Sequence, residues 1–257
     1  MGKRVASAKA LAAFTMSLTD EQALVIVDEP GKVQEFLEER ARWIAENTFV
    51  IPLSDEEAVQ LLIQWKGYTE EQATAKVRVW RIYAQKMGYT GPVVWKVKAG
   101  FSLKSHAPAA GPCYQNLQYL QGWELKNDEP TKDSLVFWVP RLVEGSLNKN
   151  GTQMETLRAE QRNAHELPSN HCDCFGSIDL LFALILAHYK RDGKRVPLDC
   201  KYAASDTLLV VGLRLVAGGF DGVGASCDGW LGNAGAGVGF FLLGVEELGS
   251  PATPAGE

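Results

Sequence analysis

The chain has 257 residues, of which 46% are hydrophobic and 22% are charged, a composition that argues against disorder of the whole chain and is typical of a globular protein. The net charge of −5 offers no basic surface to nucleic acid, so we expect no nucleic-acid partner. The apolar run LLFALILAHY is much shorter than the ~20 residues of a membrane span. We therefore predict no membrane span.

The N-terminal segment MGKRVASAKALAAFTMSL starts like a signal peptide, but Lys9 and Thr15 interrupt its apolar run and no clear small-residue cleavage site follows. We interpret residues 1–20 as a flexible arm and residues 249–257 as a C-terminal tail. The compartment stays open between the cytoplasm and the surface of a phage or a cell. The five cysteines are odd in number and scattered, which predicts reduced thiols rather than a disulfide framework.

Residues 21–92 are predicted to form a small helical module. The segment Val33–Asn47 is charged and amphipathic. Serine followed by acidic residues predicts a second helix over Ser54–Trp65, and Thr69–Met87 begins with the same kind of capping signal. Tryptophans and leucines stand at helical spacing in these segments, so we interpret them as residues of a core.

Strand patterns begin at residue 93. Val93–Lys104 alternates like a half-buried strand, and Ser134–Pro140 is a second short apolar strand. The polar segment Arg141–Pro168 is expected to begin with a helix. Ser177 then caps an almost continuously apolar helix, predicted to be the most buried of the protein, which Gly193 ends. Helices and strands in this order predict an α+β fold.

The densest group of reactive side chains is His171-Cys172-Asp173-Cys174, directly before the apolar helix. Cysteine and histidine ligate zinc, but a closed site needs four ligands and no second pair completes it, so we predict no metal site and no cofactor. Cys174 near the positive helix end would favour a thiolate, yet no third group orients a base. We predict no catalytic residue. An enzyme that uses Cys172, Cys174 or Cys227 with His171 stays an alternative.

The segment Thr207–Gly244 is rich in glycine, valine and alanine. It contains neither lysine nor a GxxxxGK[ST] motif, which argues against a phosphate loop. Alternation in LLVVGLRLVAGGF predicts extended chain, and GVGFFLLGV predicts a closing strand. The small residues between them are interpreted as loops and strand ends that a firm scaffold exposes.

The same segment lacks whole residue types. Residues 207–244 contain no Lys, Glu, Gln or Met, although residues 1–206 contain 46 of them. A glycine-rich β structure lowers that expectation, but a sharper cause exists. Randomising the two adenines of AAY codons gives NNY codons, which never encode Lys, Glu, Gln, Met or Trp. Trp230 is the exception to this alphabet, and we predict that it is a fixed scaffold residue.

The C-terminal pattern resembles a known family. Gly218-Gly219-Phe220, then Cys227 and Trp230, then Gly237–Leu242 resemble the end of the C-type lectin-like domains related to formylglycine-generating enzymes. In those domains a GGSW-like turn precedes a GFRLA-like strand. Upstream, RVPL followed by Tyr202-Ala203 is similar to their RLPTEAEWEYA region. Together with the NNY-like alphabet, the segment resembles the variable proteins of diversity-generating retroelements.

The resemblance implies a C-type lectin-like display domain over residues 93–248, with residues 207–244 as its variable region and Ile178–Tyr189 in its frame. It implies a binding protein for a protein or cell-surface ligand, and the helical module would position the domain or make it a homo-oligomer. A structural surface protein stays a further alternative. The expected ligand-contacting residues are Leu208, Leu209, Val210, Val211, Leu213, Val216, Asp221, Val223, Ala225, Ser226, Asp228, Leu231, Asn233, Ala234 and Ala236.

Overall fold

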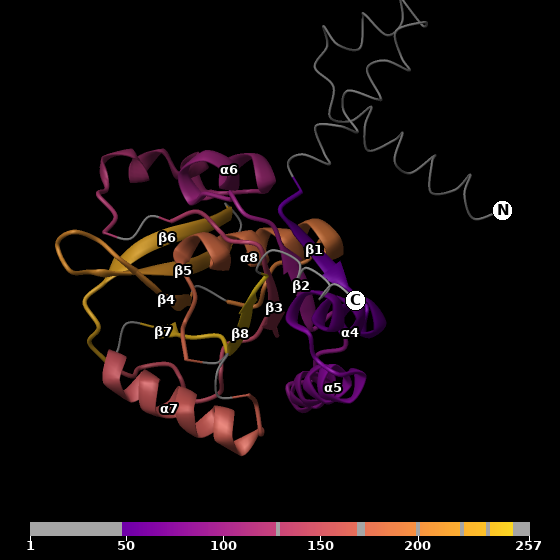
Figure 1. The fold of residues 1–257 in the computed structure, drawn as a ribbon. Coiled ribbons are helices and arrows are strands. Elements are labelled where there is room, and N and C mark those ends of the chain that lie inside the picture. The colour runs from indigo at the N-terminus through magenta and orange to yellow at the C-terminus, as the bar shows by residue number, and fades with distance from the viewer. Residues whose placement is uncertain are drawn as a thin grey trace, which may run out of the picture. The chain divides into compact units, whose positions relative to one another are not determined.

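The computed structural model describes residues 48–126, 129–168, 173–198, 201–221, 224–234 and 237–248. In these residues helices and two four-stranded sheets form an α+β fold, which confirms the predicted class (Figure 1). The predicted arm, the helix expected over residues 33–47 and the C-terminal tail lie outside the described residues.

Reciprocal capping starts the first two described helices, as predicted. Helix α4 (Asp55–Lys66) follows Ser54, whose hydroxyl accepts the Glu57 N–H while the Glu57 carboxylate accepts the Ser54 N–H. Helix α5 (Glu70–Lys86) follows Thr69, which makes the same pair of bonds with the third residue of the helix. Such boxes satisfy backbone N–H groups that have no partner within a helix. Because both partners of each box lie within four residues, the sequence predicts accurately where these helices begin.

The other helices differ more from expectation. Helix α6 (Leu103–Ala110) replaces the last residues of the strand predicted over 93–104. A 3-10 segment, η2 (Tyr114–Gly122), follows it. The helix expected at the start of the polar segment instead begins later, as α7 (Gly151–Ala164), because Asn150 provides the cap.

Helix α8 (Ile178–Asp192) has ten of its 15 residues buried, the highest share among the described helices, as predicted. Its cap is Ser177, and Gly193 ends it in the left-handed conformation at φ 63°. None of the helices in the described residues is long and apolar enough to cross a membrane.

Sheet A has the order β1-β2-β3-β8, with all neighbours antiparallel. Its strands are Val50–Leu53, Val94–Val97, Ser134–Trp138 and Leu243–Glu247. Every residue of β3 is buried, because helices cover both faces of this sheet. Strand β8 is last in the strand order, so it is an edge strand of sheet A and pairs only with β3 among the described strands.

Sheet B has the order β6-β5-β4-β7, and its strands are Tyr202–Leu208 (β4), Arg214–Asp221 (β5), Gly224–Trp230 (β6) and Val238–Gly239 (β7). The first three strands are antiparallel, and β7 runs parallel to β4. The interpretation of residues between the two apolar strands as exposed loops and strand ends is wrong for β6, which is a mostly buried strand of seven residues. Its small residues have low strand propensity, but backbone hydrogen bonds to β5 need no side chain.

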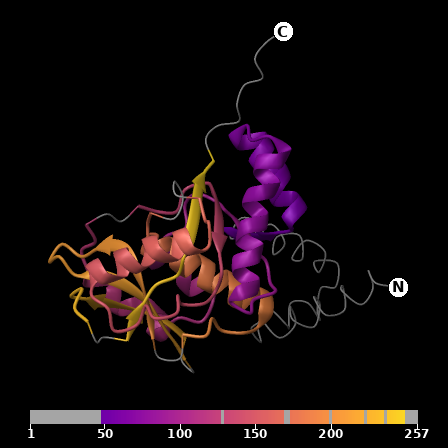
Figure 2. The same ribbon diagram turned by 90° about the horizontal axis from the view of Figure 1, so that it is seen from below.

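Two hydrophobic cores lie on opposite faces of sheet A. The α8 core includes Trp95 and Trp138 of sheet A together with the apolar residues of α8. The α5 core includes Phe137 of sheet A and Trp80 of α5, whose rings stack at 5.8 Å between centroids. Figure 2 shows α4 and α5, in indigo, beside the yellow strand β8. Both cores continue onto sheet B, so each of its faces is covered as well.

The domain boundary predicted at residue 92 has no counterpart. The contact pattern divides the chain between Thr48 and Phe49, and residues from Phe49 onward form one unit. Strand β1 precedes α4 in the chain and pairs with β2, so helices α4 and α5 lie between two neighbouring strands of sheet A in the sequence. The buried ion pair of Lys76 in α5 with Glu246 in β8 joins the helices to the C-terminal strand. Helices α4 and α5 are thus part of the domain that they were expected to precede.

Candidate ligand-binding site

The predicted ligand-contacting residues lie at two ends of sheet B. Leu208 pairs with Arg214, and Arg214 pairs with Trp230, so the β4–β5 turn and the loop after β6 leave the same end of the sheet (Figures 1 and 2). We call this the hairpin end. Asp221 pairs with Gly224 at the opposite end. The structure therefore brings residues 208–213 together with residues 228–234 and places Asp221 and residues 224–226 toward the other end of the sheet.

Large apolar side chains are exposed at the hairpin end. Val210 is 58% exposed, Val211 is 78% exposed and Leu231 is 79% exposed, the three highest values among large hydrophobic residues in the described part of the chain. The smaller or polar candidates Asp228, Asn233 and Ala234 are also exposed, whereas Leu208, Leu213 and Ser226 are half-buried. Exposed apolar side chains that gather in one place are typical of an interaction surface.

Two of the predicted contacts are core residues instead. Val216 and Ala225 are 2% and 1% exposed and belong to the α5 core and the α8 core, so their side chains cannot contact a ligand. Alternation along a strand cannot identify an outer face when both faces are covered. Leu209 is buried but lines a groove described below. Outside the described side chains lie Asp221, Val223 and Ala236.

Trp230 is a core residue. Its ring is buried in the α5 core, and its indole N–H donates to the Asn233 carbonyl at 3.0 Å. The Gly151 N–H at the start of α7 donates to the Gly232 carbonyl at 3.1 Å. These two bonds hold the loop that presents Leu231 to solvent.

A groove of about 500 Å³ opens at the hairpin end. Its lining residues, which define the hairpin groove, are Gly122, Trp123, Glu124, Leu209, Val210, Val211, Leu213, Asp228 and Gly229. The Val210 N–H donates to the Glu124 carbonyl at 3.0 Å, and the Leu209 N–H closes the turn onto the Leu213 carbonyl at 2.7 Å. The exposed turn is therefore held from both sides. Gly122, Trp123 and Glu124 are site residues that sequence reasoning missed.

The segment before the groove is strained and tied to sheet B. Residues 115–117 have φ angles of 45°, 50° and 56°, a left-handed conformation that costs ~1–3 kcal/mol per non-glycine residue. The turn brings Tyr119 to β6, where its hydroxyl donates to the Cys227 carbonyl at 3.0 Å and accepts the Cys227 N–H at 2.9 Å. Burial raises the pKa of Tyr119 to about 12, so the hydroxyl keeps the proton that it donates. Tyr119 also packs edge-on against Trp123, which supports one wall of the groove.

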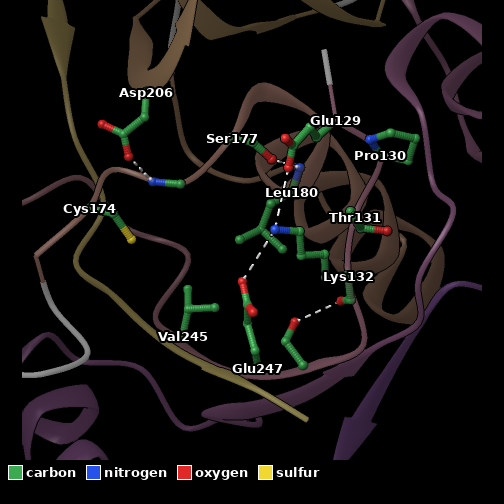
Figure 3. A pocket seen from close by; sticks show the side chains of 12 residues that line it. Glu129, Pro130, Thr131, Lys132, Cys174, Ser177, Leu180, Asp206, Val245 and Glu247 are labelled. Carbon is green, nitrogen blue, oxygen red and sulfur yellow. Dashed lines mark hydrogen bonds and ion pairs between the residues drawn. The ribbon is translucent and has the colours of Figure 1, made fainter. Parts of the chain in front are cut away.

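A second, polar cleft of about 210 Å³ lies near the start of α8 and the end of β8 (Figure 3). Lys132 stands between Glu129 and Glu247, with N–O distances of 3.3 and 3.7 Å. The hydrogen bond to Glu129 and the charge of Glu247 hold the pKa of Lys132 above its ordinary value. Asp206 accepts the Phe175 and Gly176 N–H groups at 2.7 and 2.9 Å. The charged groups of this cleft thus have partners within the protein.

Cys174 lies in this cleft, and its environment does not favour a thiolate. Burial, together with the charge of Asp206, raises the pKa of Cys174 despite its place before α8. Burial also raises the pKa of Cys227. His171 and Cys172 lie outside the described residues. Among the residues that the structure describes, no three His, Cys, Asp or Glu side chains come together as metal ligands.

No protein-family model, curated protein or solved structure matches this chain. Its function is therefore inferred from the pattern of its residues and from the geometry of the hairpin end.

Proposed function

We propose that this chain is a ligand-binding protein in which a C-type lectin-like scaffold displays a variable surface to a protein or cell-surface ligand. The supporting observation is that the exposed apolar residues of the segment are of types that NNY codons encode, whereas the one residue outside that alphabet is buried. Val210, Val211 and Leu231, whose residue types fit NNY codons, are the most exposed large apolar side chains of the residues that the structure describes. Trp230, whose type no NNY codon encodes, is buried beside them.

Such a surface binds by removing apolar area from water. Burial of apolar surface stabilises a complex by ~25 cal/mol per Å², from which the cost of association is subtracted. The hydrogen bonds of Val210 and Leu209 already order the β4–β5 turn, so binding orders little further backbone. Rigid turns with exposed valines are thus suited to bind a protein surface.

Several residues of the same segment are constrained by packing, which supports the proposal that part of the segment is scaffold. A Cβ at Gly218 would lie 2.3 Å from the Lys201 carbonyl oxygen, so this position of the Gly-Gly-Phe motif requires glycine. The closing segment Phe240–Leu243 is buried throughout. Residues of the resembled pattern therefore have packing reasons to stay constant, while their exposed neighbours have none.

The enzyme alternative has less support from the described residues. A nucleophilic cysteine needs an accessible thiolate, and burial raises the pKa of both Cys174 and Cys227. The structural alternative gives no reason for valines and a leucine to be exposed at one end of sheet B.

The proposal is tested by sequencing the neighbourhood of the gene. We expect a reverse transcriptase gene and a template copy of residues 207–244 in which the codons of Val210, Val211 and Leu231 read AAY. The codons of Gly218 and Trp230 should be the same in template and gene. A neighbourhood with neither element, or template adenines placed as often at buried as at exposed positions, would contradict the proposal.

A further inference from the structure

The hairpin groove has one wall inside the variable segment and one wall outside it. The turn residues Leu209–Leu213 and Asp228 lie within residues 207–244, whereas Gly122–Glu124 precede that segment. Under the proposed function, on which this inference rests, the second wall is the same in every variant. The fixed wall therefore limits the chemistry of the ligands that the groove accepts.

Both walls contribute negative charge. Glu124 on the fixed wall and Asp228 on the variable wall are exposed, and they are the only charged residues among the described residues that line the groove. The ammonium group of Lys104 donates to the Trp123 carbonyl at 2.8 Å but Lys104 does not line the groove. A ligand that enters the groove consequently meets two carboxylates, and a cation complements them.

The rest of the lining is apolar. Val210, Val211 and Leu213 line the groove on the turn side, and the half-buried Trp123 lines it on the fixed wall. An arginine fits this combination, because its methylene stem packs on apolar surface and its guanidinium pairs with carboxylates in a bidentate manner. A guanidinium also stacks favourably on an indole face. The neighbouring valines leave apolar area for an aliphatic side chain beside the arginine.

We propose that the hairpin groove binds a protein segment in which an arginine stands next to an aliphatic side chain. The volume of about 500 Å³ lies within the ~300–1,000 Å³ of pockets that hold a small ligand, which suits a few side chains of such a segment. Variation at the turn and at position 228 would change the affinity for particular segments, while Glu124 and Trp123 keep the preference for arginine.

To test this inference, a phage-displayed library of random linear peptides is selected for binding to the immobilised full chain. We expect the enriched peptides to contain arginine next to Leu, Ile, Val or Met. The double variant Glu124→Gln/Asp228→Asn should weaken the binding of these peptides by at least ~10-fold, the effect of ~1.4 kcal/mol. Glu160→Gln removes an exposed carboxylate on α7, outside the groove, and should leave binding unchanged.

Three results would overturn the inference: enriched peptides without excess arginine, full binding to the double variant, or no peptide whose binding depends on the groove. Val211→Asp separates this inference from the function on which it rests. If Val211→Asp abolishes binding of peptides that lack arginine, the groove is a binding site with a different preference. The template codons at the gene test the proposed function independently of any peptide.

Discussion

Sheets A and B contain similarly apolar segments but expose them differently. In sheet A every residue of β3 is buried, and α8 and α5 cover its two faces. In sheet B the strand centres are equally covered, yet Val210, Val211 and Leu231 at the hairpin end stand in solvent. The apolar character of a segment therefore does not determine its role. Its position in the sheet does, because the strand centres are buried while the turn and the loop at the hairpin end are exposed.

The largest expected effect comes from removing one charge of the buried pair that supports sheet A. Lys76→Met leaves the Glu246 carboxylate, 1% exposed, without its ammonium partner. Loss of one partner of a buried ion pair costs ~3–5 kcal/mol of unfolding free energy. Urea unfolding of the full chain measures this loss.

The double variant Lys76→Met/Glu246→Leu is the matched control, because it removes both charges and should recover most of the stability. Val211→Asp, at the hairpin end, should change the unfolding free energy by less than ~0.5 kcal/mol. If the Lys76→Met protein is as stable as the Val211→Asp protein, the buried charge pair of sheet A contributes no more to stability than an exposed side chain at the hairpin end.

A second prediction compares two neighbours in the chain. Trp230→Ala removes a buried ring and its bond to Asn233, and should cost ~3 kcal/mol or more. Leu231→Ala removes an exposed side chain and should cost less than ~0.5 kcal/mol. Thermal unfolding of both variants measures the difference. Similar losses of unfolding free energy in the two variants would contradict the distinction between Trp230 as a core residue and Leu231 as a surface residue.

The smallest effect is a dependence of stability on pH that belongs to the frame. Burial lowers the pKa of His188 in α8, although the charge of Asp192 raises it to a lesser extent. Below the unfolded pKa of ~6.5 the unfolded chain binds more protons at this group than the folded protein does, so stability falls as pH decreases. Urea midpoints at pH 7.5 and 5.5 should differ less in His188→Gln than in the natural chain. The Val211→Asp variant should keep the full difference, and a flattened response there would contradict the assignment to the frame.

Helix starts could be predicted from the sequence because their cause is local. Ser54, Thr69 and Ser177 each accept a backbone N–H three residues ahead, so a short stretch of sequence contains both partners. The buried nature of α8 also followed from its own residue types, which are almost continuously apolar.

Features that depend on distant partners could not be predicted in this way. Strand β6 forms because its backbone pairs with β5. Ala225 is buried in the α8 core and forms a β-bridge with Cys113, far away in the chain, which its own residue type does not indicate. Trp123 and Glu124 belong to the groove because Leu125 forms a β-bridge with Leu209, far along the chain. A tryptophan in the polar stretch QGWELK was the only local signal.

The segment Phe240–Leu243 also limits which sequence changes the protein can accept. Phe240 and Leu242 enter the α5 core, whereas Phe241 and Leu243 enter the α8 core, so successive side chains point to opposite sides. Inserting or deleting one residue just before Phe240 would send each of these side chains to the wrong side. The segment Phe240–Leu243 can therefore change residue types only within this alternation, and its register relative to the two cores is fixed.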